Sequence, residues 1–155
     1  MSSAYAVFRP RRGRVVATTV AIAAVVLFGL AALLLPGGAS SAGGWQVTDR
    51  LFLFLVGLLV AALMWRYATI RAVPTPGGLL VRNLFTTRRL EWSQILQVQL
   101  GAGAPWVTLE LVDTDTVAVM AIQSTDGARA AADASRLAAL VQALGEHREP
   151  RRGPA

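Results

Sequence analysis

The sequence predicts two transmembrane α-helices followed by an α+β domain, a small antiparallel β-barrel or sandwich of about six to seven strands capped by a C-terminal α-helix. Three observations lead to this fold class. Two long apolar runs occupy the first half of the chain, short alternating segments fill the middle, and a helical apolar stripe ends at residue 144. The mean hydropathy of +0.51 over 155 residues is too high for an average soluble domain.

The first apolar run covers residues 15–35, and none of its 21 residues carries a charge. A helix rises about 1.5 Å per residue, so this run can cross a hydrocarbon core of about 30 Å. A secretory signal peptide is the alternative, because a basic segment precedes the run and residues 40–42 form a plausible cleavage site. The run is longer than the apolar region of a usual signal peptide, about 7 to 15 residues, and we therefore favour a retained span.

The second apolar run, residues 51–65, has 15 uncharged residues and could by its length be a buried helix of a soluble core. Its flanks indicate a membrane instead, because Arg50 and Arg66 lie where long side chains reach the headgroups. Aromatic residues that favour the interface also flank it: Trp45, Trp65 and Tyr67. We place the second span at residues 47–68, and the Gly- and Ser-rich residues 36–46 are expected to form an external connector.

Arginines are distributed unevenly around the two spans. Four lie in the basic N-terminal segment, residues 1–14, and Arg66 and Arg71 follow the second span, whereas the connector region has Arg50 beside Asp49. Positively charged flanks stay inside, so we expect a multi-pass protein of the plasma membrane with both termini in the cytoplasm. The absence of cysteine fits a reducing compartment.

The middle of the chain contains short strands separated by turn residues. The segment ILQVQL alternates apolar and polar side chains with a period of two, which is typical of a half-buried strand. Proline, glycine, asparagine and aspartate mark the breaks between segments. Six strands are expected in meander order, at residues 69–73, 79–84, 88–92, 95–100, 106–112 and 116–122.

The last predicted element is an amphipathic helix over residues 126–144. Its apolar stripe follows the i, i+3, i+4, i+7 pattern: Leu137, Leu140, Val141 and Leu144. Ser124 or Asp126 is expected to cap the start of the helix, and Gly145 its end. Charged residues on the opposite face are expected to be solvated: Arg129, Asp133 and Arg136. The polar tail, residues 146–155, is expected to be disordered.

One stretch carries a family resemblance. GLLVRNLFTTRRLEWSQILQV, followed by WVTLELVDTDTVAVMAI and a helix, resembles the bacterial pleckstrin-homology (PH) domain family of small actinobacterial membrane proteins, low-molecular-weight protein antigen 6 type. The residues that match the family pattern are Gly78, Val81, Arg82, Arg88, Arg89, Trp92, Ser93 and Ile95. The resemblance covers residues 67–143 and implies a PH-like domain, at 69–145, behind two transmembrane helices. It implies no activity, because the family's molecular function is largely uncharacterised.

The candidate contact residues for a lipid or a partner are five arginines and one tryptophan: Arg66, Arg71, Arg82, Arg88, Arg89 and Trp92. Arginine offers bidentate contacts to phosphate, and a basic charge near an anionic bilayer contributes about 1 kcal/mol. In eukaryotic PH domains the loop between the first two strands supplies such cations, but the matching loop here, PTPGG, has none. Plain surface arginines that orient the domain are the simpler interpretation. A tryptophan at a strand end is more often a packing residue than a ligand platform.

The expected function is binding or scaffolding of a protein or peptide partner at the cytoplasmic face of the membrane. An open strand edge, or the groove beside the C-terminal helix, would receive that partner. Recognition of anionic phospholipid by Arg82, Arg88 and Arg89 is the alternative. A third possibility is an accessory subunit of a larger membrane complex, since small residues in the first span permit close helix approach.

Other function classes find no support in the sequence. The net charge of +6 belongs to the membrane flanks, because nine arginines and eight acidic residues nearly balance after residue 68, and no basic stripe for nucleic acid is seen. The single histidine, His147, lies in the tail, and Asp113 and Asp115 are expected to form a turn. No general base, nucleophile or metal shell can be assembled. We therefore expect neither an enzyme nor a cofactor.

Overall fold

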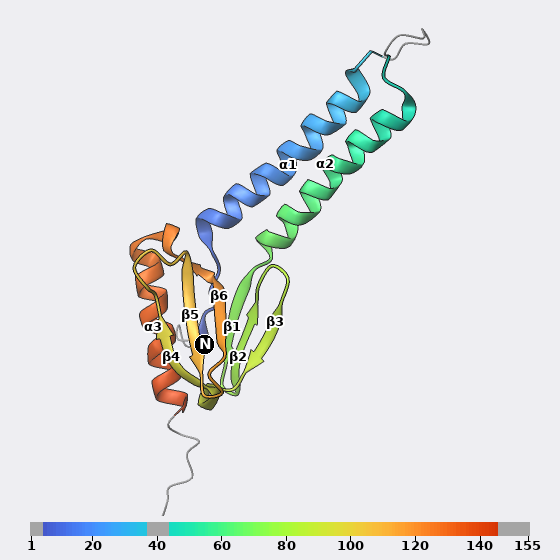
Figure 1. Cartoon of the computed structure of the whole chain (residues 1–155). Helices are drawn as coiled ribbons and strands as arrows, with labels where there is room; N and C mark the ends of the chain where they lie inside the picture. Colours follow the sequence, from blue (N-terminus) through green and yellow to red (C-terminus); the bar gives the residue numbers. More distant parts are fainter. Residues whose placement is uncertain (1–4, 37–43, 146–155) are drawn as a thin grey trace, which may run out of the picture. The chain divides into compact units, whose positions relative to one another are not determined.

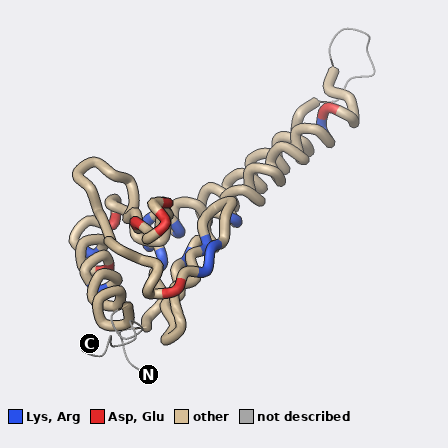
Figure 2. Tube along the Cα trace, turned by 60° about the horizontal axis from the view of Figure 1, so that its bottom comes forward, with Lys and Arg blue, Asp and Glu red and all other residues tan. Residues whose placement is uncertain are grey.

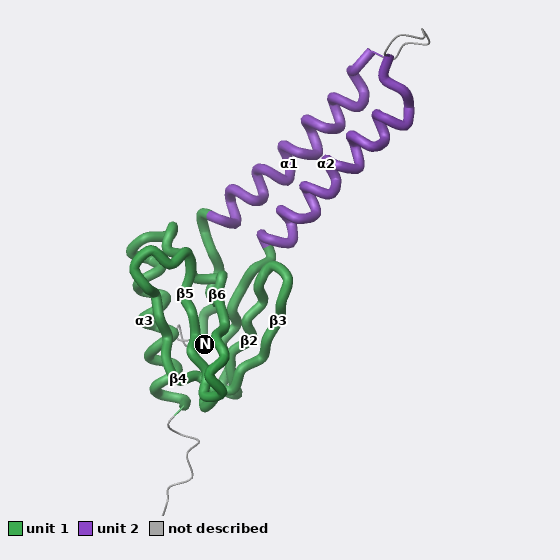
Figure 3. The backbone as a smooth tube through the Cα atoms, viewed as in Figure 1, with its two compact units in different colours: residues 1–12, 69–155 green, residues 13–68 purple. Residues whose placement is uncertain are grey.

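The computed structural model describes residues 5–36 and 44–145. The chain forms two compact units, unit 1 from residues 1–12 and 69–155 and unit 2 from residues 13–68 (Figure 3). The chain therefore begins in unit 1, leaves it for unit 2, and returns to it. The considered cleavage site at 40–42, most of the connector and the tail lie outside the described residues.

Two helices, α1 (Arg11–Leu34) and α2 (Val47–Ala68), account for unit 2 (Figure 1). Both are long and apolar enough to cross a membrane. They pack through small residues, because a Cβ added at Gly57 of α2 would lie 2.5 Å from the Cβ of Phe28 in α1. Most large apolar side chains of the pair are exposed, as expected of helices whose solvent is lipid.

The described residues of unit 1 form six strands in two antiparallel sheets and the helix α3 (Figure 1). The first sheet has the order β1-β2-β3, with bounds Arg71–Thr75, Gly78–Arg82 and Thr87–Leu90. The second has the order β4-β5-β6, with bounds Ile95–Gln99, Trp106–Leu111 and Thr116–Gln123. The short 3-10 helix η2 (Trp92–Gln94) joins the sheets, and η3 (Ser124–Asp126) precedes α3 (Ala128–Gly145). The predicted fold class is confirmed, with a barrel that is not closed.

The strand bounds differ by one or two residues from the sequence prediction, and β1 and β3 show why. β1 continues to Thr75, so the turn to β2 has only Pro76 and Gly77 between the paired residues Thr75 and Gly78. Pro74 is tolerated inside β1 because it lies at a non-hydrogen-bonded position of the ladder, where no N–H is required. β3 ends at Leu90, because a short helix starts at Trp92.

The core of unit 1 lies between the two sheets and α3. Alternate residues of β5 and β6 are buried, which is the period-two pattern of a half-buried strand. The helix supplies the stripe that the sequence predicted, with Leu137, Leu140 and Val141 buried. The short segment before α1 also enters this core, although no periodic pattern marks it in the sequence.

Phe8 is the residue that ties the N-terminal segment to unit 1, and it is only 1% exposed. Its N–H donates to the Ala72 carbonyl at 2.9 Å, and the Ala72 N–H donates to the Phe8 carbonyl at 3.1 Å. The guanidinium of Arg136 lies 3.9 Å from the Phe8 ring centroid, and its Nη1 donates to the Ala6 carbonyl at 3.0 Å. The expectation that Arg136 belongs to a solvated face was therefore wrong, because this side chain covers a buried ring.

Asp126 caps a helix, but a different one from that predicted. Its carboxylate accepts the backbone N–H groups of Arg11 and Arg12, at 3.1 and 3.2 Å, and so caps the start of α1 instead of α3. The Arg12 guanidinium also donates to the Thr125 carbonyl at 3.1 Å. These contacts join residues more than 110 positions apart in the sequence, and all of them lie within unit 1.

Candidate functional site

Strand β3 has a free edge in the described part of unit 1. β2 is the only strand neighbour of β3, so one side of β3 has no strand partner among the described residues. The Asn83 N–H donates to the Thr86 carbonyl at 2.8 Å and closes the β2–β3 turn. Since hydrogen-bonded and non-bonded pairs alternate along an antiparallel ladder, Thr87 and Arg89 direct their backbone N–H and C=O groups away from β2.

The other three edges of the two sheets are occupied or blunted. Phe8 bridges to Ala72 along β1. The buried side chain of Asn83 covers β6, where it donates to the Ala118 carbonyl at 2.7 Å and accepts the Met120 N–H at 3.2 Å. The register of β4 with β5 is irregular between Ile95 and Gln97, and such bulges discourage further pairing.

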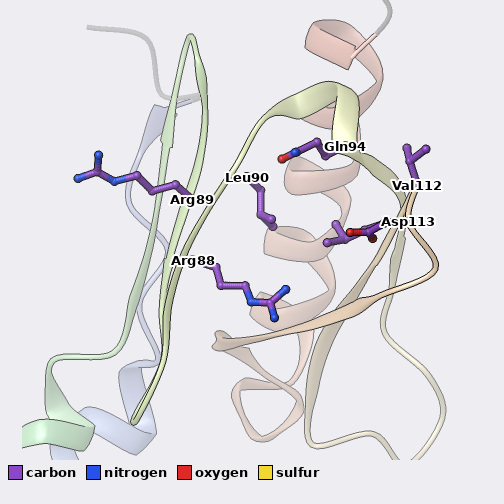
Figure 4. A pocket seen from close by; sticks show the side chains of 7 residues that line it. Arg88, Arg89, Leu90, Gln94, Val112 and Asp113 are labelled. Carbon is purple, nitrogen blue, oxygen red and sulfur yellow. The ribbon is translucent and has the colours of Figure 1, made fainter.

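Two adjoining hollows, of about 520 and 570 Å³, follow the edge of β3. Both are lined by Arg89, Leu90 and Gln94. Leu90 projects from β3 into the first hollow, and Val112 and Asp113 of the β5–β6 turn stand on its other side (Figure 4). Leu90 and Leu111 are almost fully buried and give an apolar floor, whereas Val112 is 58% exposed at the rim. We call the two hollows together the β3 groove.

Arg88 and Arg89 lie on opposite faces of β3, as neighbouring strand residues must. Arg88 is opposite Val81, on the side of the core, and its guanidinium forms an ion pair with Asp115 at 2.6 Å. The hydrogen bond and charge of Arg88 hold the pKa of the Asp115 carboxyl below its ordinary value, and the Thr116 N–H contributes to the shift. The two arginines adjacent in the sequence therefore lie on opposite faces of β3, and Arg88 is bound to the Asp115 carboxylate.

The other two arginines of the first sheet share the outer face with Arg89. Arg71 and Arg82 stand directly opposite each other on β1 and β2, and Arg89 is opposite Leu80 on the same face. Like charges placed opposite each other are unfavourable in a sheet. Among the described residues no ion pair is found for Arg71, Arg82 or Arg89, and the Nε of Arg71 is buried without a hydrogen-bond partner. Basic and acidic residues are otherwise both present on unit 1 (Figure 2).

The two remaining candidates do not join these arginines. Arg66 lies in the last turn of α2 and so belongs to unit 2. Trp92 is 1% exposed, and its indole N–H donates to the Thr75 carbonyl at 2.9 Å. It is a core residue that fixes η2 to the β1–β2 turn, and we leave it out of the contact surface.

The aspartates of the β5–β6 turn act as turn formers. The Asp115 N–H donates to the Asp113 carboxylate at 3.1 Å, and Thr114 between them has a φ of 66°. No group of three acidic or histidine side chains suited to a metal ion is found within the described residues. The roles of Phe8 and Asn83, and the helix that Asp126 caps, could not be predicted from local patterns because they depend on long-range contacts.

Comparisons with known proteins agree with this architecture. The family model described as a bacterial PH domain matches residues 70–139, within the range in which the resemblance was expected. Uncharacterised proteins of Mycobacterium bovis and of two Mycobacterium tuberculosis strains are each 33% identical over 117 residues, which cover 68% of this chain and 76% of each relative. No solved structure matches the chain.

Proposed function

The chain belongs to the bacterial PH-domain family, and we propose that it is a non-catalytic binding module, tethered at the cytoplasmic face of the membrane, that receives an extended segment of a partner protein along the free edge of β3. The supporting observation is the coincidence of an unpaired strand edge with the β3 groove. A strand added to β3 would pair with the outward backbone groups of Thr87 and Arg89.

The proposed tether is supported by unit 2 and by the way the chain enters and leaves unit 1. Residues before α1 and after α2 belong to one folded unit, which supports a helical hairpin that starts and ends on one side of the bilayer. The arginines at the two flanks favour the cytoplasmic side. The buried position of Phe8 supports a retained first span, because cleavage would remove a core residue.

Site-specific photocrosslinking in cells that make the full chain tests the docking site. A photoreactive amino acid at Val112, on the rim of the groove, should crosslink a discrete protein, whereas one at the exposed Gln142 of α3 should not. The Arg89→Pro variant removes one outward N–H and should abolish the crosslink from Val112. Crosslinking that persists in Arg89→Pro, or occurs equally from Gln142, would show that the partner does not pair with β3.

A second candidate function is contact with anionic lipid headgroups, and the unpaired arginines on the outer face favour it. Arg71 follows α2 by three positions in the chain and faces Arg82 with no acidic partner among the described residues. Arginine binds phosphate oxygens in pairs, which would satisfy donors such as the Arg71 Nε. The same observations set Arg88 apart from this candidate, because Asp115 already neutralises it.

Sedimentation with vesicles tests the lipid candidate if unit 1 is made water-soluble by replacing residues 13–68 with a Gly-Ser linker, which keeps Phe8 in place. Binding to phosphatidylglycerol vesicles should fall with added salt and be lost in the double variant Arg71→Gln, Arg82→Gln. Arg88→Gln is the matched control and should bind as well as the parent. An equal loss in the control would refute the assignment of the outer face.

A further inference from the structure

The turn between β2 and β3 presents an aromatic side chain to solvent. It comprises residues 83–86, and the hydrogen bond from Asn83 to Thr86 leaves Leu84 and Phe85 at the two central positions. Phe85 is 80% exposed, more than any other large apolar side chain described in unit 1. The residues that line the β3 groove all lie outside this turn, so the turn is a surface separate from the proposed partner site.

The geometry of the turn does not require Leu84 and Phe85 at its two central positions. Central positions of a tight hairpin turn favour glycine, asparagine or aspartate, and a leucine and a phenylalanine there expose apolar surface without helping the backbone to turn. A single exposed apolar side chain is common on protein surfaces and needs no explanation. An apolar pair at the tip of a rigid turn, beside Arg82, for which the described part of the chain shows no ion pair, is a more specific combination.

The turn is held rigidly, so the exposure of Phe85 is built into the fold. Asn83, the first residue of the turn, is 8% exposed, and both polar atoms of its side chain bond to the backbone of β6. The residue next to it, Arg82, ends β2 opposite Arg71 of β1. Phe85 is thus fixed at the tip of the β2–β3 hairpin, close to Arg82, whose neighbour on the outer face is Arg71 of β1.

The β2–β3 turn lies at the end of the first sheet from which the chain connects back to α2. The pairing of Arg71 with Arg82 places the turn at the end of the first sheet where β1 begins (Figure 1). Only Thr69 and Ile70 separate that start from α2. The opposite end of the same sheet is the β1–β2 turn at Pro76 and Gly77.

We propose that Phe85 inserts into the interfacial region of the bilayer spanned by α1 and α2, with Arg82 and Arg71 on anionic headgroups beside it. Aromatic side chains favour this region because one part of it is apolar and another is hydrated. Arginine and anionic phosphate complement each other in charge and geometry. The turn is then a third attachment that restricts how unit 1 can rotate at the membrane.

A fluorescent label on a single cysteine tests this, because the chain has no cysteine of its own. The full chain carrying Phe85→Cys is reconstituted in vesicles of phosphatidylcholine and phosphatidylglycerol. The matched control is Gly77→Cys, at the other end of the same sheet, where an added Cβ meets nothing within 4 Å. Both sites are exposed turns, and an unchanged trypsin cleavage pattern checks that each variant folds as the parent does.

The label at residue 85 should be quenched by lipids carrying a doxyl group in the acyl chain and protected from iodide in the water phase. The label at residue 77 should show the reverse. Equal iodide quenching at the two positions would overturn the proposal, as would doxyl quenching at residue 77 alone. Adding Arg82→Gln to Phe85→Cys should shift the label toward iodide accessibility, and no shift would remove the arginine from the proposal.

Discussion

Replacing Phe8 with alanine is the most direct test of the structure. Phe8 lies in a stretch whose sequence shows no strand or helix pattern, so its place in the core is known from the structure alone. A buried phenylalanine truncated to alanine costs about 3–5 kcal/mol, which includes the cavity that remains. The ring is 1% exposed and also lies under the Arg136 guanidinium, so we expect a loss toward the upper part of this range. The backbone bonds between Phe8 and Ala72 are kept in the variant.

The assay is pulse proteolysis of the full chain in detergent micelles over a urea series, reading the fraction of unit 1 that survives. Stabilities of single domains are about 5–15 kcal/mol, so the urea midpoint of Phe8→Ala should fall severely. Val7→Ala, at a neighbouring residue that is 37% exposed, is the control and should change stability by less than about 0.5 kcal/mol. Similar midpoints for the two variants would refute the assignment of Phe8 to the core.

Three further predictions follow from close contacts. Gly78→Ala should destabilise unit 1 by more than about 1 kcal/mol in the same assay, because the added Cβ would collide with the Leu90 carbonyl, and an unchanged midpoint would contradict the packing of β2 on β3. Arg88→Gln should raise the pKa of Asp115 toward its ordinary value of 3.8, measured by NMR titration. The depressed pKa means that the pair stabilises the fold above that value and loses this effect as the pH falls through the lowered pKa, and an unmoved titration would exclude the ion pair. Gly57→Val should loosen the helical hairpin, seen as altered mobility in detergent gels, whereas Gly29→Ala should not, since its added Cβ meets only ordinary contact at 3.9 Å.

Much of the fold could be predicted because it depends on local patterns. Uninterrupted apolar runs predicted α1 and α2, and alternation predicted strands such as β5, where Val107 and Leu109 are buried as expected. Boundaries moved where a residue changed the local geometry, as Trp92 did by starting η2. The period of the pattern fixes the type of element but not its last residue.

The candidate site was less accessible to sequence reasoning. Adjacent arginines suggested one basic cluster, but strand alternation sends Arg88 toward Asp115 and Arg89 outward. The partner of each arginine depends on which strands pair and in which register. The roles of Phe8 and Asp126 depend on contacts across more than 60 residues of chain, and no window of the sequence contains both partners.

The discontinuity of unit 1 has a consequence for how the chain is made. The segment that contains Phe8 is synthesised before the strand that pairs with it, because β1 follows both apolar helices in the chain. Unit 1 can therefore complete its core only after the helical hairpin has been synthesised. Until then, the segment before α1 has no β1 to pair with. Closing so long a loop costs little more entropy than closing a short one, because that cost grows only with the logarithm of its length.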